Sequence, residues 1–490
     1  MPSFPAPETR EFVRAALQRS DYTEPAICQL FGVATTSEAL ALADVVLARK
    51  ATPRSALTVL LRLFFQGGSV DIGEATATLG AAETSALEAS GLIVAEAGAF
   101  RASVQLVPVG SLVIASDRPS RHLAACSDFV VGPAPVSRVL AEFMIRRPVE
   151  RTLDLGCGSG VLGLRAAAHS RHVVATDINP RAVAIAEFNA QLNGLDHVRA
   201  VSGDLFSGVA GERFDLIICN PPFVISPQAE FVYRDGGLDI CRRIVREVAD
   251  HLQPDGFLQM LCNWPEAGEQ EWQAECASWF EDNACDAWVL RMQSYPRAAY
   301  ASIWLSQQYR GQSMPAGAFD VWMTHLESLG ARSVGGGLVV MRPARGRKPW
   351  LEIRDAPPSL GAAGDSIVRA FVARDAMARL GSDAEFLDRI WRPSPNLQQT
   401  SVRGLAATGW GAPVVELRAG DGFAFVARVD PVAAELVSLM DGRMSLREVV
   451  HAWAEARGMP AEMFVEHLPE AMRKLLALGL LEPVAAESAG

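Results

Sequence analysis

Leu153-Asp-Leu-Gly-Cys-Gly-Ser-Gly160 is the stretch of sequence that decides the fold, because it joins the end of an apolar run to three closely spaced glycines. Glycines at this spacing allow a tight turn with positive φ between a strand and a helix. Short apolar runs alternate with helix-like stretches around it; the runs are 152–155, 172–176, 198–202, 215–219 and 257–262, and the clearest helix-like stretches are 181–192 and 238–252. Such alternation is typical of a parallel sheet covered by helices on both faces. We therefore predict an α/β fold with a mainly parallel sheet in the centre of the chain.

The length of 490 residues exceeds that of one ordinary core and favours about three domains. In residues 1–118, short helices followed by strands predict a winged-helix-like domain; the helices are 56–65, 70–79 and 83–90, and the strands are 92–94, 104–107 and 111–115. Helices at 433–440, 445–456 and 464–478 predict a second winged-helix-like module within residues 357–490, after a proline-rich linker that reaches about residue 429. The central domain then covers residues 119–356, with a tryptophan-rich helical insertion at about 264–330.

The charge and cysteine content of the chain limit the kinds of partner that it is expected to bind. The net charge of −11 and the pI of about 5.4 argue against broad binding to phosphates, so non-specific DNA binding is not expected. The notable basic clusters, Arg242-Arg243, Arg246 and residues 342–348, are interpreted as solvated faces. The eight cysteines show neither a Cys-x-x-Cys pair nor a Cys/His ligand spacing, so we expect no metal site. Without a secretory signal or an apolar span of about 20 residues, we expect a cytoplasmic protein and no membrane partner.

Acidic residues follow three successive strands and suggest the ligand. Asp154 lies two residues before the first glycine, where a carboxylate can hold the amino group of methionine but would repel a pyrophosphate. Asp177 ends the next strand and can accept both hydroxyls of a ribose, while Asp204 follows a third strand and can accept from an adenine amine, with Leu205 or Phe206 against the ring. Together these acids describe the outline of S-adenosylmethionine. Each acid alone is also explained as a helix cap or a turn carboxylate.

Asn220-Pro221-Pro222-Phe223 follows the apolar run 214–219 and is the second informative motif. The side-chain carbonyl of Asn220 and the backbone carbonyl of Pro221 can converge on an NH₂ group, since neither proline has an N–H to donate. Two such acceptors orient a nitrogen lone pair and stabilise the positive charge that develops during attack on a methyl group. Phe223 offers a face on which a planar amide or base can stack.

These motifs closely resemble those of class I S-adenosylmethionine-dependent methyltransferases, over about residues 129–343. The Asn-Pro-Pro-Phe turn, with Arg234-Asp-Gly-Gly-Leu-Asp-Ile240 and Leu252-Gln-Pro-Asp-Gly-Phe257, looks most like the glutamine-N5 methyltransferases of release factors, and is similar to small-domain rRNA and tRNA amino-methyltransferases. The resemblance implies a Rossmann-like domain, with residues 220–223 holding the target nitrogen. It also implies a cofactor site formed by Asp154, Gly156, Cys157, Gly158, Gly160, Asp177, Ile178, Asp204, Leu205 and Asn220. The release-factor enzymes usually carry Tyr where this chain has Phe223, and their N-terminal domain is a helical bundle.

The acceptor is expected to be a planar amide or exocyclic amine nitrogen, with a protein glutamine favoured over RNA because of the negative charge. Phe231, Tyr233 and Arg234 are candidates for closing over it. Two other functions fit parts of the pattern. Gly158-Ser-Gly160-Val-Leu-Gly163 satisfies the dinucleotide motif of nicotinamide oxidoreductases, and a regulator could bind S-adenosylmethionine without catalysis.

Overall fold

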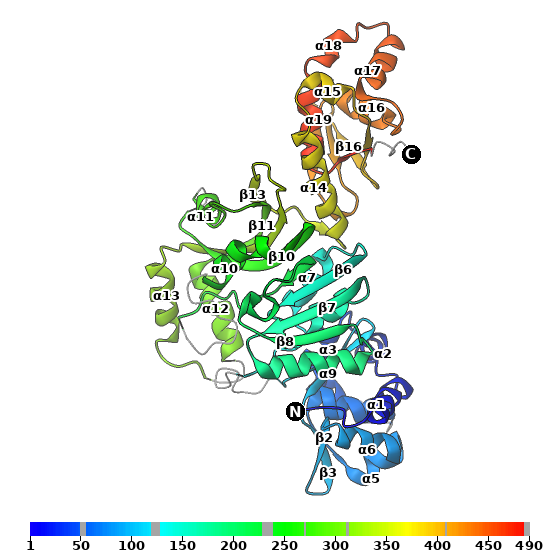
Figure 1. Ribbon diagram of the computed structural model, residues 1–490, viewed down its shortest axis with the longest axis vertical. Helices are drawn as coiled ribbons and strands as arrows, with labels where there is room; N and C mark the ends of the chain where they lie inside the picture. The colour runs from blue at the N-terminus through cyan, green and yellow to red at the C-terminus, as the bar shows by residue number, and fades with distance from the viewer. Residues whose placement is uncertain are drawn as a thin grey trace. The chain divides into compact units, whose positions relative to one another are not determined.

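The computed structural model describes residues 1–49, 55–118, 128–227, 239–268, 271–309, 313–406 and 409–484. The chain forms two compact units (Figure 1). Unit 1 comprises Met1–Ala141 and Arg147–Asp355, and unit 2 comprises Glu142–Arg146 and Ala356–Gly490. The parts expected at 1–118 and 119–356 thus fall in one compact unit, apart from residues 142–146 and Ala356.

Unit 1 is built around an eight-stranded sheet with the spatial order β13-β11-β12-β10-β9-β6-β7-β8. The strands are β6 (Val149–Leu155), β7 (Ser170–Asp177), β8 (Val198–Ser202), β9 (Phe214–Cys219), β10 (Leu252–Glu266), β11 (Cys285–Pro296), β12 (Ser333–Pro343) and β13 (Leu351–Asp355). Neighbouring strands pair in parallel except where β12 runs antiparallel to β10 and β11. The prediction of a mainly parallel α/β sheet is confirmed.

The central strands are apolar along their length because both faces of the sheet are covered. Leu153, Val174, Ile217 and Leu258 are each at most 1% exposed. Burial on both faces replaces the alternation of polar and apolar residues with continuous apolar runs. The covering helices include α8 (Val161–Ala166), α9 (Pro180–Asn193), α10 (Asp239–Glu247) and α11 (Trp272–Ser278).

The expected helical insertion at 264–330 is wrong in part, because it contains β11, a strand of the main sheet. Helices α12 (Arg297–Gln308) and α13 (Ala318–Ser328) lie in the connection from β11 to β12. Residues 285–290 are all buried, and Trp288 is fully so. A short apolar run buried on both faces lacks strand alternation, so its sequence cannot be told from that of a buried helix.

Among the described residues up to Arg118, unit 1 contains six helical segments and two antiparallel groups of strands. The helices are α1 (Pro7–Arg19), α2 (Glu24–Phe31), α3 (Thr36–Arg49), α4 (Ala56–Leu60) continued by the π-helix η1 (Leu61–Gln66), α5 (Ile72–Leu79) and α6 (Ala81–Ala89). One group has the order β1-β3-β2, with β1 (Ser69–Asp71), β2 (Ile93–Glu96) and β3 (Ala99–Ala102); the other is the hairpin of β4 (Gln105–Val109) and β5 (Leu112–Ser116). Val70 was expected in a helix but lies in β1, since the Asp71 side chain caps α5 by accepting from Glu74 N. The winged-helix interpretation remains a prediction.

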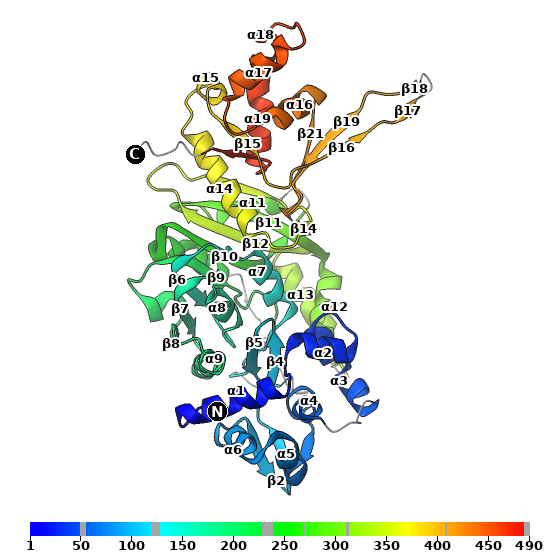
Figure 2. The ribbon, with the colours of Figure 1, turned by 90° about the vertical axis from the view of Figure 1, so that its right-hand side faces the viewer.

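Unit 2 is more ordered than the linker expected between residues 357 and 429. That segment contains α14 (Gly364–Ala378), α15 (Asp383–Leu387) and the antiparallel sheet β16-β19-β21, formed by Gln398–Val402, Val414–Arg418 and Val426–Val429. The hairpin of β16 and β19 continues into β17 (Leu405–Ala406) and β18 (Gly409–Trp410) (Figure 2). The later helices are α16 (Pro431–Leu439), α17 (Leu446–Glu455), α18 (Glu462–Val465) and α19 (Leu468–Ala477). Prolines at 393 and 395 suggested a linker, but Pro393 lies in β15 (Trp391–Pro393), which pairs with β22 (Leu481–Pro483).

Residues of the earlier chain complete unit 2. Helix α7 (Pro135–Phe143) ends inside Glu142–Arg146, the segment that belongs to this unit. The rings of Phe143 and Phe423 stack with centroids 5.3 Å apart, and the backbone N–H of Ala363 donates to the Glu142 carbonyl. A Cβ added at Gly364 would collide with the Met144 carbonyl oxygen, so α14 begins in direct contact with this segment.

Candidate active site

The motif residues predicted from sequence lie at one edge of the main sheet. Asp154 lies near the end of β6 and Asp177 ends β7, while Asp204 follows β8 and Asn220 follows β9. These four strands are adjacent and parallel, so their carboxyl ends share an edge. In open α/β sheets ligands bind outside this edge.

The glycine-rich turn between β6 and α8 is held by hydrogen bonds to β7. Backbone N–H groups of Gly156 and Cys157 donate to the Thr176 carbonyl, both at 2.9 Å, and Gly158 N donates to Asp177 Oδ2 at 2.9 Å. Gly156, Gly158 and Gly160 have φ of +71°, +53° and +79°, values that only glycine adopts freely. A Cβ at Gly156 would have no atom within 4 Å, so this side of the turn is open.

Asp154 is buried beneath the turn and bonded to the following helix. Its Oδ2 accepts from Gly163 N at 2.7 Å, and the residue is 1% exposed. Burial raises the pKa of Asp154 to about 7; the Gly163 N–H opposes this rise and the charge of Asp177 adds to it. Burial, then the charges of Asp154 and Asp177, also raise the pKa of the Cys157 thiol well above its usual range, so the thiol is protonated.

The ends of β7 and β8 are joined through Asp177. Its Oδ1 accepts from Asn179 N at 2.9 Å, and its backbone carbonyl accepts from Gly203 N. The neighbouring Ile178 is 70% exposed, so it offers an apolar surface beside Asp177. Asp204 Oδ2 accepts from Arg243 of α10 at 3.0 Å, and Leu205 is half-buried with a φ of +49°.

The 220–223 turn leaves a buried acceptor. Asn220 Oδ1 is buried and, among the described residues, has no hydrogen-bond partner. Since a buried polar atom without a partner is costly, this oxygen is suited to a ligand N–H. Phe223 is partly buried against the core of unit 1, and Val224 and Ile225 are fully buried. Phe231, Tyr233 and Arg234, the residues expected to close over the site, lie outside the described residues.

Three residues around the site were not predicted from the sequence. Tyr300 of α12 accepts from Ile225 N at 3.1 Å and from Asn263 Nδ2 at 2.9 Å. Asn189 of α9 donates to the Ser159 carbonyl of the glycine-rich turn at 2.9 Å. Tyr300 ends the short aromatic stretch Tyr295-Pro-Arg-Ala-Ala-Tyr300, which a sequence reading can single out. No local pattern marks Asn189 or Asn263, because their partners are distant in sequence.

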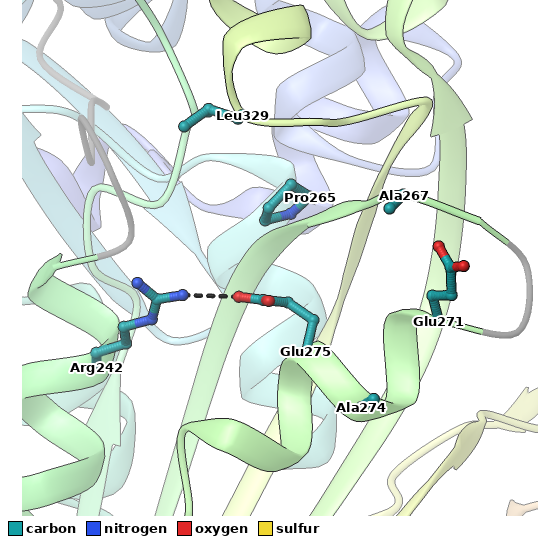
Figure 3. Close-up of a pocket in the computed structure, with 7 residues that line it drawn as sticks. All are labelled: Arg242, Pro265, Ala267, Glu271, Ala274, Glu275 and Leu329. Atoms are coloured by element: carbon teal, nitrogen blue, oxygen red, sulfur yellow. Dashed lines mark hydrogen bonds and ion pairs between the residues drawn. The ribbon is translucent and has the colours of Figure 1, made fainter.

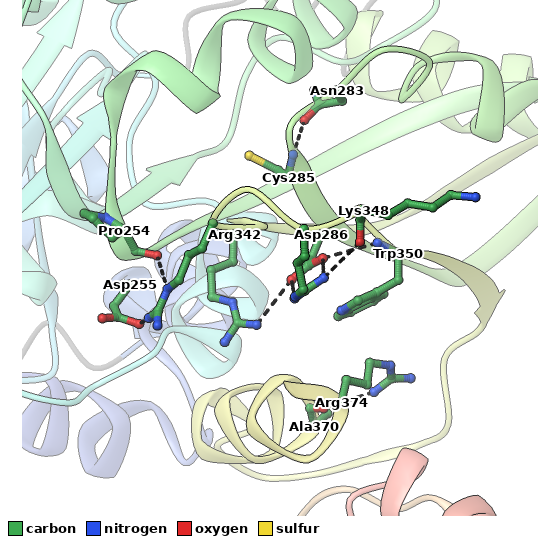
Figure 4. Close-up of polar contacts among 12 residues, drawn as sticks. Pro254, Asp255, Asn283, Cys285, Asp286, Arg342, Lys348, Trp350, Ala370 and Arg374 are labelled. Atoms are coloured by element: carbon green, nitrogen blue, oxygen red, sulfur yellow. Dashed lines mark hydrogen bonds and ion pairs between the residues drawn. The ribbon is translucent and has the colours of Figure 1, made fainter. Parts of the chain in front are cut away.

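The basic segment 342–348 contains one buried arginine, and its other arginines pair with acids while staying partly exposed. Arg342, 4% exposed, donates to Asp286 Oδ2 at 3.2 Å (Figure 4). Arg347 pairs with both oxygens of the same fully buried carboxylate. Arg345 pairs with Asp255. The interpretation of residues 342–348 as a solvated face is therefore wrong for Arg342, whose desolvation is offset by a buried partner.

A pocket of about 480 Å³ lies beside α10 and α11 and is crossed by an ion pair between Arg242 and Glu275 at 2.7 Å (Figure 3). Its lining consists of Arg242, Pro265, Ala267, Glu271, Ala274, Glu275 and Leu329. None of the cofactor or target residues predicted from the sequence lines this pocket.

Within the described ranges, no cluster of three or more His, Cys, Asp or Glu could hold a metal ion. No single described helix is long and apolar enough to cross a membrane, although the bent pair Pro7–Phe31 and Thr36–Ala43 together passes by length and composition.

The sheet order, the open glycine turn and the acids after successive strands define a class I methyltransferase domain, whose cofactor is S-adenosylmethionine. The residues present fit that cofactor: the turn at Gly156 is open, Ile178 is exposed beside Asp177, and Asn220 Oδ1 is buried and unpaired within the described part of the chain. Residues 134–274 match the model of the methyltransferase small domain, and residues 369–483 match that of a domain of unknown function, DUF7782.

Curated relatives agree with this assignment. The ribosomal protein uL3 glutamine methyltransferase of Bradyrhizobium diazoefficiens is 41% identical over 126 residues, which are 22% of this chain and 40% of that protein. The release factor glutamine methyltransferase of Deinococcus radiodurans is 39% identical over 123 residues, 22% of this chain and 44% of the relative. The ribosomal RNA small subunit methyltransferase C of Alcanivorax borkumensis is 34% identical over 113 residues, 23% and 32% of the two chains. The chain thus spans less than half the length of each.

Proposed function

We propose that this chain methylates the side-chain amide nitrogen of a glutamine in a protein, with S-adenosylmethionine as methyl donor. The observation that carries the proposal is the unpaired, buried Oδ1 of Asn220 at the carboxyl end of β9, next to the partly buried Phe223. The acceptor amide would donate one N–H to Asn220 Oδ1 and the other to the Pro221 carbonyl, while its plane stacks on Phe223.

When bound, the cofactor supplies an activated methyl group on a sulfonium. The role of the turn is to hold the acceptor nitrogen with its lone pair in line with that methyl group. As the N–C bond forms and the S–C bond breaks, positive charge develops on nitrogen, and the two carbonyl acceptors stabilise it. The nitrogen then loses a proton to water. Asp154, Asp177 and Asp204 would hold the amino group, the ribose and the adenine of the cofactor, in that order along the sheet edge.

Two observations favour protein over RNA as the acceptor. Two of the three relatives described above are named as glutamine methyltransferases. Three arginines of the basic clusters also make ion pairs within the chain: Arg242 with Glu275, Arg243 with Asp204, and Arg345 with Asp255. Since the named substrates of those relatives belong to translation, we propose that the reaction takes place in the cytoplasm. RNA is the second candidate, because the third relative is named as an rRNA methyltransferase.

The test is transfer of label from [methyl-³H]S-adenosylmethionine into the separated protein and RNA fractions of a lysate lacking this enzyme. We expect a labelled protein band, which peptide mass spectrometry should assign to glutamine. Asn220→Ala should cut incorporation by roughly 100-fold or more, the cost of losing a donor or acceptor that acts on developing charge. Its affinity for S-adenosylhomocysteine, measured by calorimetry, should stay within about twofold if Asn220 acts mainly on the acceptor.

Asn283→Ala is the matched control: the Asn283 side chain donates to the Val245 carbonyl of α10 and accepts from Cys285 N at the start of β11, so the substitution should leave the rate unchanged. Label confined to RNA would contradict the protein acceptor but keep the N-methyltransferase. Incorporation that Asn220→Ala leaves intact would remove the assigned role of the turn.

A further inference from the structure

We infer that Tyr300 is a positioning residue for methyl transfer, which fixes the 220–223 turn through the backbone of Ile225. The inference rests on the proposed function of that turn. Tyr300 comes from α12, in the connection between β11 and β12, and lies 75 residues beyond Ile225 in sequence.

The phenol oxygen of Tyr300 joins two elements that flank the turn. It accepts from Ile225 N, two residues after Phe223, at 3.1 Å, and from Asn263 Nδ2 on β10 at 2.9 Å. Tyr300 is 3% exposed, Asn263 is 4% exposed and Ile225 is fully buried. Solvent water therefore cannot readily replace the Tyr300 oxygen as the acceptor for these two donors. Burial raises the pKa of Tyr300 above its usual range, and the hydroxyl stays neutral.

The ring of Tyr300 is held from two sides. It meets Trp304 edge-on and Trp322 at a tilt, each with centroids 6.2 Å apart, and Trp322 is fully buried. The position of the phenol oxygen is therefore set by packing in the core of unit 1. Asn263 is fixed in turn against Gly336 of β12, where an added Cβ would lie 2.6 Å from Asn263 Oδ1.

The hydrogen bond from Ile225 N to Tyr300 affects catalysis by fixing the position of the 220–223 turn. The two prolines before Phe223 donate no backbone hydrogen bonds, so the turn has few ways to be held from within. Among the described residues after the turn, Ile225 is the first whose backbone N–H donates to a side chain. The rate of methyl transfer depends on the alignment of the acceptor nitrogen with the methyl group, so this hydrogen bond bears on catalysis. Loss of the phenol oxygen should let the turn move while the cofactor residues on β6, β7 and β8 stay in place.

Tyr300→Phe tests the inference, because it keeps the ring and removes only the oxygen. In hydrogen exchange followed by mass spectrometry, the peptide containing Ile225 should exchange at least about tenfold faster in Tyr300→Phe than in the unmodified chain. At saturating S-adenosylmethionine the maximal rate of label incorporation should fall roughly 10- to 100-fold. The KM for S-adenosylmethionine and the calorimetric Kd for S-adenosylhomocysteine should change less than about twofold.

Tyr22→Phe is the matched control. Tyr22 is also buried, 2% exposed, and donates its hydroxyl to the Leu106 carbonyl at 2.8 Å in the part of unit 1 that precedes the main sheet. It should lower the melting temperature by a similar amount without changing the maximal rate or the exchange of Ile225. An unchanged exchange rate of Ile225 in Tyr300→Phe would overturn the inference, as would a maximal rate that falls no further than in Tyr22→Phe. If the unmodified chain transfers no methyl group at all, the proposed function fails, and the exchange of Ile225 still decides whether Tyr300 holds the turn.

Discussion

At Asp154, burial and one backbone donor act on the same carboxyl group in opposite directions. Burial raises its pKa to about 7 even though Gly163 N donates to it. In the unfolded chain the group ionises near its ordinary value of 3.8, so folding favours the protonated form. The contribution of this group to stability is therefore full below about pH 4 and is lost as pH rises through about 7.

Asp154→Asn removes the titration but keeps an oxygen that can accept from Gly163 N. Without cofactor, we expect the variant to gain stability relative to the unmodified chain as pH rises from 4 to 8, by up to about 4 kcal/mol. Urea unfolding at several pH values measures the difference. A difference that does not change with pH would show that the carboxyl ionises equally in both states.

Among individual site residues, those at the ends of strands were predicted from the sequence, whereas those that contact the site from distant parts of the chain were not. Asp154, Asp177 and Asn220 lie at one edge because the carboxyl ends of parallel strands meet at the same edge of the sheet. The apolar runs in the sequence are enough to predict those strands and where they end. Tyr300 bonds to the backbone N–H of Ile225, an atom that every non-proline residue has, so no residue type marks the partner.

Helix α9 connects the early hairpin of unit 1 to the glycine-rich turn. Asn189 and Asn193, one helical turn apart, each bond to both the N–H and the carbonyl of a residue in β5, Ala115 and Val113 respectively. The helix thus covers the outer edge of β5 as a neighbouring strand would. Asn189 alone also donates to the Ser159 carbonyl.

Asn189→Ala and Asn193→Ala form a matched pair. Both should destabilise the chain, by about 1–3 kcal/mol for each buried backbone group left unpaired, with the larger loss at the fully buried Asn189. Only Asn189→Ala should weaken binding of S-adenosylhomocysteine, by roughly tenfold, because only Asn189 holds the turn. Calorimetry and urea unfolding separate the two effects; equal affinities in the two variants would contradict this link.

Helices and strands were predicted well where the pattern of apolar residues was unambiguous. The five expected strands of the sheet correspond to β6 to β10, since each is a short apolar run bounded by polar turns. β11 was missed because its first half is buried throughout, and α14 was missed because prolines on both sides suggested a linker. In both cases tertiary packing, which local patterns do not report, decides the structure.

In the whole molecule, the two compact units are not two consecutive segments of the chain. Glu142–Arg146 belongs to unit 2, although the residues on either side belong to unit 1. Phe143, Met144 and Ile145 are each at most 3% exposed, and residues of α14 and the ring of Phe423 lie against this segment.

A chain that ends at residue 355 should therefore be less stable, although it retains every residue of the proposed active site. We expect a cost of about 1.5–3 kcal/mol for each of the three side chains that becomes exposed, together with binding of a dye specific for apolar surface. A chain ending at residue 484 is the control and should behave as the full chain does. Equal stability of the two truncated chains, measured by urea unfolding, would contradict the assignment of residues 142–146 to unit 2.

The placement of residues 142–146 also sets an order of events during synthesis. Translation proceeds at about 5–20 residues per second, so Gly364 is made roughly 10–40 seconds after Met144, its neighbour in the folded protein. For that interval the nascent chain carries an uncovered apolar segment at the start of its methyltransferase domain. A chaperone that binds exposed apolar stretches would find its site there, and would lose it once the later residues of unit 2, from Ala356 onward, are made and folded.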